Sequence, residues 1–178
     1  MRITFSLLVL TLCILTINVG VAGSADIIKI AGDAGAVVVP AVAGIMTLIY
    51  HDSEGTVQFL KAYASAAAMT YGLKYAVKER RPDGSEHSFP SFHTSSAFAG
   101  AAFIQQRDGW KYGLPAYIAA SFVGYSRLES KQHHIQDVIG AAVIGIGTNL
   151  IFVKPFKSVT VTPVVGEDFN GILIGKSF

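Results

Sequence analysis

The chain has 178 residues, of which 51% are hydrophobic and only 15% charged, and this length suffices for one domain with a buried core. So apolar a composition is unusual for a soluble protein and favours a membrane or membrane-surface protein. The net charge of +2 and the scattered basic residues exclude a general nucleic-acid binder. The one basic cluster, Lys74, Lys78, Arg80 and Arg81, indicates a local anion site instead.

The first apolar run, residues 1–26, has the layout of a secretory signal: one arginine, a long uncharged stretch and small residues before Asp26. We expect cleavage after Ala22 or Ala25. The alternative is an uncleaved membrane anchor, because about 18 apolar residues are enough to span a bilayer. Both interpretations send the rest of the chain out of the cytoplasm. Cys13, the single cysteine, lies in this run, so neither an internal disulfide nor a thiolate metal cluster is expected.

The segments after this run are expected to form about five helices, because they are apolar and separated by polar punctuation. They cover residues 34–50, 56–79, 91–106, 112–127 and 136–153. Asp33 is expected to be the N-cap of the first helix, and Pro40 to kink it. Most of these apolar stretches are at or below the usual spanning length, so a bundle lying against a membrane competes with full insertion.

The last expected helix carries small residues, Gly140, Ala141, Gly145 and Gly147, which allow close contact with a neighbouring helix. The tail after it alternates β-branched and polar residues around a Gly-Glu-Asp turn, as a hairpin does. The expected fold is therefore an all-α bundle of about five helices with a short C-terminal β-hairpin-like tail. The expected divisions are a signal peptide or anchor over 1–25, a helical domain over 26–156 and the tail over 157–178.

Three groups of polar residues stand out from the apolar helices. The first is Lys74 with Arg81-Pro82, in which the lysine and the arginine are separated by six residues across a helix end. A flexible point charge and a planar fork together suit a phosphate held by several oxygens. The alternative is a pair of ordinary helix C-terminal cations, which the helix dipole favours.

The second group is Pro90-Ser91-Phe92-His93, where a loop becomes a helix. Free backbone N–H groups at a helix start bind anions, a serine hydroxyl adds a donor, and a histidine there can deliver a proton. The alternative is a serine N-cap with an incidental histidine.

The third group is Ser126-Arg127, followed after five residues by His133 and after three more by Asp137. A histidine and an aspartate four apart share one helix face, so the carboxylate can accept the ring N–H and leave the other nitrogen free as a nucleophile or base. The alternative is a surface histidine with an ordinary (i, i+4) partner. His134 points about 100° away from His133 and is expected to have no direct chemical role.

One anion pocket explains the three groups jointly, because all lie at helix ends or in adjoining loops and antiparallel helices bring alternate ends together. In this order and spacing they resemble the type 2 phosphatidic acid phosphatase (PAP2) superfamily, shared with bacterial class A acid phosphatases and vanadium haloperoxidases. KYAVKERRP and SRLESKQHHIQD match the first and third family motifs in full. PSFH matches Pro-Ser-Gly-His at three of four positions. The resemblance spans residues 74–137, somewhat over a third of the chain.

The resemblance implies a role for each matched residue. His133 is the implied nucleophile, which forms a phosphohistidine, and Asp137 is its orienting partner. His93 is the implied general acid, which protonates the leaving oxygen. The implied phosphate cradle needs no metal or other cofactor and consists of Lys74, Arg81, Ser91, Phe92 and Arg127.

Phe92 stands where the family usually has glycine. If this residue must adopt φ > 0 to aim its N–H at phosphate, phenylalanine is a poor choice. If it has ordinary helical geometry, its N–H still serves and its ring narrows the entrance. The substitution therefore bears on substrate fit more than on the chemistry.

The implied function is a metal-independent phosphatase that hydrolyses a phosphate monoester or pyrophosphate of a membrane lipid, in a bacterial inner membrane or the periplasm with the site facing the periplasm. The alternatives are a soluble periplasmic acid phosphatase for small esters, a vanadium haloperoxidase and a non-catalytic phosphate or phospholipid binding module. A zinc site is a further alternative, built from His87, His93, His133 and His134. Both implied catalytic histidines argue against the binding module, and a zinc ion would leave the nearby cations unexplained.

Overall fold

The structure is a computed structural model that describes residues 24–156, 159–165 and 170–176. The expected signal peptide or anchor, residues 1–25, lies outside the described residues except for its last two. The described residues contain five helices, so the expected all-α class is confirmed. The helices are α2 (Ser24–Ile49), α3 (Ser53–Ala76), α4 (Phe92–Asp108), α5 (Trp110–Glu129) and α6 (Ile135–Phe152).

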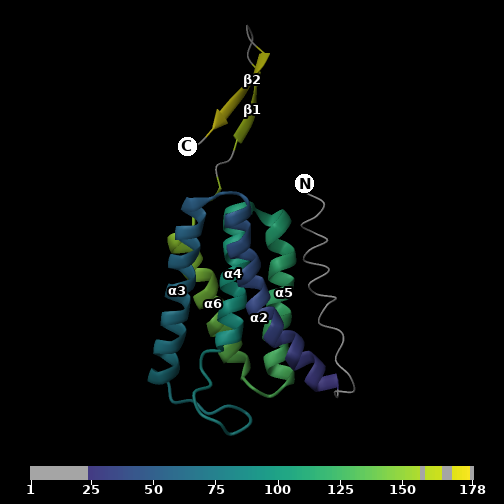
Figure 1. Cartoon of the computed structure of the whole chain (residues 1–178), viewed down its shortest axis with the longest axis vertical. Helices are drawn as coiled ribbons and strands as arrows, with labels where there is room; N and C mark the ends of the chain where they lie inside the picture. The colour runs from purple at the N-terminus through teal and green to yellow at the C-terminus, as the bar shows by residue number, and fades with distance from the viewer. Residues whose placement is uncertain (1–23, 157–158, 166–169, 177–178) are drawn as a thin grey trace.

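α4 lies at the centre of the bundle and packs against the other four helices. Successive helices run in alternating directions, as Figure 1 shows. The ends of α3 and α5 and the starts of α2, α4 and α6 therefore lie at the lower end in that view. The loop of residues 77–91 and the short connection between α5 and α6 lie at this same end.

Local sequence signals account for most of the helix starts. The Asp52 side chain accepts the N–H of Gly55 at 2.9 Å and caps α3. Ser91 accepts the N–H of Thr94 at 3.4 Å and caps α4. Gly109, with φ of 86°, separates α4 from α5, a backbone conformation that glycine adopts readily. These caps place the polar loop residues directly against the first turns that follow them.

The start of α2 corrects the sequence prediction. The helix begins at Ser24 rather than at residue 34, so Asp33 lies inside it and is not its N-cap. The Asp33 carboxylate instead accepts a hydrogen bond from Arg127 of α5 at 2.6 Å. A lone aspartate before an apolar run is typical of a cap, and a partner 94 residues away gives no local signal.

Small residues let the helices approach closely. A Cβ on Gly100 would lie 2.6 Å from the α2 backbone, and one on Gly145 would lie 2.7 Å from the α4 backbone. Ala141 is completely buried. The expected close helix contact is therefore confirmed at Gly145, whereas Gly147 has open space around it and the prediction is wrong there. A Cβ on Gly140 would lie 2.6 Å from Phe89, which belongs to the loop before α4 and not to a helix.

The outer surface of the bundle is strongly apolar. Large hydrophobic side chains are exposed on α2, α3, α5 and α6, among them Val37, Leu60, Ile118 and Val143. Two segments are long and apolar enough to cross a membrane, Ala25–Ile49 and Ile135–Phe152. Because soluble monomers rarely expose large apolar patches, an outer surface with this many exposed apolar side chains suits contact with lipid.

A two-stranded antiparallel hairpin follows the bundle. β1 (Val159–Val165) pairs with β2 (Asn170–Lys176), with Val159 opposite Lys176. It extends from the upper end in Figure 1, away from the loops at the lower end.

Candidate active site

The three polar groups predicted from the sequence meet at the lower end of the bundle. The backbone N–H of Ser91 donates to the carbonyl of Asp137 at 3.2 Å, which joins the second group to the third. Lys74 donates to the carbonyl of His87 at 2.7 Å. The hydroxyl of the neighbouring Ser88 donates to the Asp137 carboxylate at 2.5 Å, which joins the first group to the third. Long-range hydrogen bonds thus hold the three groups together.

His133 and Asp137 form the pair that their spacing predicts. His133 lies buried in the connection before α6, and its Nδ1 is 3.3 Å from Oδ2 of Asp137. Nε2 of His133 makes no hydrogen bond within the described residues. A ring held through one nitrogen with the other nitrogen free is the arrangement that a nucleophilic histidine needs.

The Asp137 carboxylate is held by more than its histidine. Its Oδ2 also accepts the backbone N–H of His134 at 2.8 Å and the Ser88 hydroxyl. The His134 ring turns away, with Nε2 3.1 Å from the carbonyl of Arg80. Ser88 was not singled out from the sequence, because a serine 49 residues from its partner carries no local pattern.

The surroundings of His133 keep its ring neutral. Burial is the main cause, and the positive charges of Arg81 and Lys74 add to it, which together lower the pKa of His133 to about 4. Asp137 acts in the opposite direction but does not outweigh them. At neutral pH the ring is therefore unprotonated, the state in which its free nitrogen carries a lone pair.

Lys74 and Arg81 supply positive charge beside this ring. Burial and then the charge of Arg81 lower the pKa of Lys74 below its ordinary value. The Nε of Arg81 is buried and has no hydrogen-bond partner within the described residues. Because buried donors are nearly always paired in folded proteins, this one is available to an anion.

The start of α4 adds backbone donors. Phe92 and His93 are its first two residues, and no hydrogen bond to their N–H groups occurs within the described residues. Phe92 is not among the described residues with positive φ, so phenylalanine fits here without strain. Its ring packs 5.0 Å from that of Tyr71. Ser91 is completely buried, and its oxygen serves as the cap.

His93 and Arg127 meet through a residue that the sequence did not single out for the site. Oδ1 of Asp33 lies 2.6 Å from Nη1 of Arg127 and 3.3 Å from Nε2 of His93. Burial and the charges of Arg127, Arg81 and Lys74 lower the pKa of His93, whereas Asp33 raises it.

Arg127 is placed differently from a simple phosphate ligand. It is completely buried, and its other donors bond to the Lys29 carbonyl at 2.9 Å and to the Ser126 hydroxyl at 3.0 Å and 3.1 Å. Its contact with His133 is through the backbone, since its carbonyl accepts the N–H of His133 at 3.3 Å. The structure therefore brings the Arg127 guanidinium to Asp33 and His93 rather than to the His133 ring.

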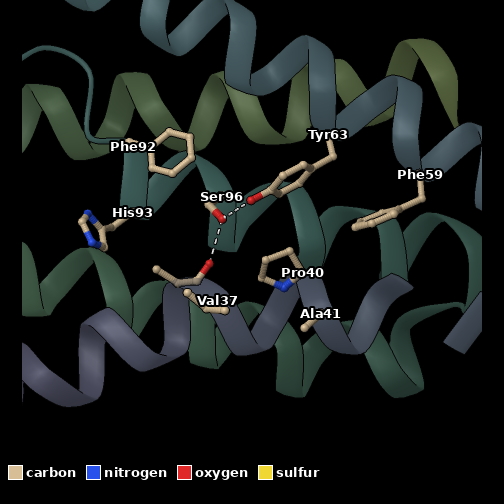
Figure 2. Close-up of a pocket in the computed structure, with 9 residues that line it drawn as sticks. Val37, Pro40, Ala41, Phe59, Tyr63, Phe92, His93 and Ser96 are labelled. Carbon is tan, nitrogen blue, oxygen red and sulfur yellow. Dashed lines mark hydrogen bonds between the residues drawn. The ribbon is translucent and has the colours of Figure 1, made fainter. Parts of the chain in front are cut away.

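An apolar cavity of about 320 Å³ opens beside His93, between α2, α3 and α4 (Figure 2). Its lining includes Val37, Pro40, Phe59, Tyr63, Phe92 and His93. The hydroxyls of Tyr63 and Ser96 bond to each other at 2.8 Å, and Ser96 also donates to the Ala36 carbonyl at 2.7 Å. Because these polar groups are paired, the cavity offers mainly hydrocarbon surface to an occupant.

The zinc alternative finds no support in the arrangement of the histidines. Within residues 24–156, 159–165 and 170–176, no three His, Cys, Asp or Glu side chains are placed to hold a metal ion. His133 and His134 have separate hydrogen-bond partners, and Nε2 of His93 lies 3.3 Å from Oδ1 of Asp33. The ring of His87 lies against that of Tyr75. The four histidines thus face different neighbours.

Comparison with known proteins supports the resemblance to the PAP2 superfamily. The sequence pattern of the PAP2 superfamily matches residues 83–158. A lipid A 4'-phosphatase of Helicobacter pylori is 28% identical over 146 residues, which cover 74% of each chain. A lipid A 1-phosphatase of Porphyromonas gingivalis is 40% identical over 88 residues, which are 47% of this chain but only 20% of the relative.

A solved structure shares the fold. The crystal structure of Aquifex aeolicus LpxE superimposes with a TM-score of 0.66 at 22% identity, over 81% of this chain and 93% of that one. The relatives named as phosphatases agree with the predicted enzyme class, a phosphoric ester hydrolase. The resemblance that the motifs indicate is confirmed: the sequence pattern of the PAP2 superfamily matches residues 83–158, which include the second and third motifs.

Proposed function

We propose that this protein is a metal-independent phosphatase that removes phosphate from a membrane lipid through a phosphohistidine intermediate. The observation that carries the proposal is the His133–Asp137 pair, with a free ring nitrogen beside Lys74 and the unpaired Nε of Arg81. A nucleophile held next to unsatisfied cationic donors suits a phosphoryl group, whose charge these donors would stabilise.

In the first step Nε2 of His133 attacks phosphorus while the bond from phosphorus to the leaving oxygen breaks. His93 gives its proton to that oxygen. Lys74, Arg81 and the N–H groups at the start of α4 stabilise the charge on the other phosphoryl oxygens. Asp137 stabilises the positive charge that develops on the His133 ring.

In the second step water attacks the phosphohistidine, and His93 accepts the proton that the water gives up. The bond between phosphorus and His133 breaks, and its electron pair returns to Nε2. The products are inorganic phosphate and the starting enzyme, so His93 acts as acid in one step and base in the next.

A lipid is the proposed substrate because of what surrounds the polar site. The apolar cavity reaches His93, the residue assigned to the leaving group, and the outer helices expose apolar side chains. A hydrocarbon chain can lie along these surfaces while its phosphate enters the site. The relatives named as lipid A phosphatases point to a lipid phosphate of this kind.

We further propose that the bundle is embedded in a bacterial inner membrane with its site at the periplasmic face. The two candidate spanning segments and the exposed apolar side chains support insertion. The lower end in Figure 1 holds the loop of residues 77–91 and the last turn of α3, to which Arg81 and Lys74 belong. Such polar and charged segments suit the membrane–water boundary.

A phosphate-release panel tests the proposal. Purified protein in detergent is assayed against lipid A, phosphatidic acid, phosphatidylglycerol phosphate and a soluble aryl phosphate, with His133→Ala as the blank. We expect release from at least one lipid to exceed release from the soluble ester. Equal or greater release from the soluble ester would instead identify a soluble-type acid phosphatase, and no release from any ester would refute catalysis.

The cavity is tested by filling it. Val37→Trp narrows the cavity, while Val143→Trp places the same ring on an exposed position of α6. We expect the first change to lower kcat/KM about tenfold for a long-chain lipid and less than twofold for a soluble ester. If the two tryptophan substitutions lowered kcat/KM for the lipid equally, the cavity would not be the surface that binds the lipid.

A further inference from the structure

Asp33 reaches the site from a part of the chain that lies before the motifs and the family match. It lies on α2, before the PAP2 match at residues 83–158 and before the first motif at Lys74. Yet its Oδ1 contacts both Nη1 of Arg127, at 2.6 Å, and Nε2 of His93, at 3.3 Å. An ionisable residue in an apolar segment that could span a membrane costs free energy unless it is paired. Residues of this kind usually have a function.

The close approach of α2 to α5 at this point is built into the sequence. A Cβ on Gly32 would overlap the hydroxyl of Ser126 and the guanidinium of Arg127, so only glycine lets the two helices come this near. The Lys29 carbonyl, one helical turn before Asp33, also accepts from Arg127 at 2.9 Å. Arg127 therefore stays docked on α2 through contacts that do not depend on Asp33.

Resting on the proposed function, we propose that Asp33 is a positioning residue that orients the His93 ring through Nε2 and favours its protonated form. Nδ1 of His93 has no hydrogen-bond partner within the described residues and is left to carry the proton for the leaving oxygen. The arrangement mirrors that of His133 and Asp137: each catalytic histidine has a carboxylate on one ring nitrogen.

The charges around His93 show why such a partner is needed. Arg127 from α5, Arg81 from the loop after α3 and Lys74 from α3 all disfavour the protonated ring, as does burial. Asp33 from α2 opposes them and raises the pKa of His93. Without the Asp33 charge, the acid form of His93 would be confined to lower pH, and less of the enzyme would hold the proton at neutral pH.

The test compares Asp33→Asn with the wild type on the best substrate of the panel, across pH. We expect kcat to fall about 10- to 100-fold at neutral pH and the alkaline limb of the profile to move to lower pH. Asp26→Asn, the same change at an exposed position of the first turn of α2, should leave both unchanged. An alkaline limb that stays in place in Asp33→Asn overturns the proposal even if kcat falls.

A double-mutant cycle separates positioning from a general structural role. Because Asp33 is proposed to act through His93, Asp33→Asn should lower kcat less than twofold in the His93→Ala background. A further tenfold loss there would overturn the proposal. If Asp33→Asn does not fold, Asp33→Glu is used instead, because it keeps the charge but moves the carboxylate. We then expect kcat to fall severalfold while the alkaline limb of the pH profile stays in place. An unchanged kcat in Asp33→Glu would overturn the proposal.

The same measurements distinguish this inference from the proposed function. A wild-type protein without phosphatase activity on any ester defeats the proposed function. Wild-type activity together with an Asp33→Asn variant of unchanged kcat and pH profile defeats only the role of Asp33.

Discussion

Each end of the bundle buries an arginine against an aspartate, but the two pairs are built differently. At the upper end in Figure 1, Nε and Nη2 of Arg107 each donate to Asp52 at 2.7 Å, and both side chains are buried, with 4% and 7% exposed. At the lower end, Arg127 reaches Asp33 through one nitrogen, and Asp33 is 43% exposed. The first pair is closed to solvent, whereas the second is open.

The further hydrogen-bond and ion-pair partners of the two pairs indicate different roles. The remaining donors of Arg107 bond to the carbonyl of Lys154 at 2.8 Å and that of Pro155 at 3.3 Å, which fastens the end of α6 to α3 and α4. Asp33 instead shares its oxygen with His93, a residue that can change its proton. A bidentate pair with saturated donors maintains structure, while an open, shared carboxylate can take part in chemistry.

The largest effect is expected at the open end. His133→Ala removes the proposed nucleophile and should lower kcat roughly 10⁴-fold or more, with the thermal unfolding midpoint nearly unchanged. His134→Ala is the matched control, because that ring faces the Arg80 carbonyl. Phosphate release by His133→Ala at the wild-type rate would remove the basis of the mechanism.

A substitution at the closed end should lower the stability of the protein rather than its catalytic rate. Arg107→Ala leaves Asp52 buried without its cation and should lower the free energy of unfolding by about 3–5 kcal/mol. Lys111→Ala, an exposed cation near the same end, should change it by less than about 1 kcal/mol. Denaturant unfolding measures both, and a fall in kcat per folded molecule in Arg107→Ala would contradict the division between the two ends.

The pH dependence of the open end follows from the pKa of His133, lowered to about 4. The proposed attack requires the unprotonated ring, so kcat/KM should hold down to roughly pH 4 and then fall about tenfold per pH unit. An acid limb centred near the ordinary histidine value would show that burial and the two cations do not control this ring. A pH–rate profile measured with enzyme checked for folding at each pH settles the point.

The smallest effect is expected from Ser88, which lies at the open end and supports Asp137. Ser88→Ala removes one of the hydrogen bonds to Oδ2 of Asp137 and should lower kcat about tenfold or less, because the His134 N–H remains. Ser85→Ala is the control, since the Ser85 hydroxyl bonds to the exposed Asp83. Equal rates in the two variants would show that Ser88 does not orient the His133–Asp137 pair.

Most of the fold was predictable because its signals are local. Apolar stretches between Asp52, Ser91, Gly109 and the loop before α6 define four of the five helices to within a few residues. The predicted start of α2 was wrong because Asp33 pairs with Arg127 in α5 instead of capping a helix. Such a tertiary contact overrides the rule that an aspartate before an apolar run is an N-cap.

The sequence by itself determined the chemical parts of the candidate site: a histidine and an aspartate four apart, two cations around a helix end, and a histidine at a helix start. Spacing within one turn or loop is enough for that. Only the tertiary structure placed Ser88 on Asp137 and Asp33 between His93 and Arg127. These contacts depend on how close the helices pack, which a glycine such as Gly32 permits without revealing its partner.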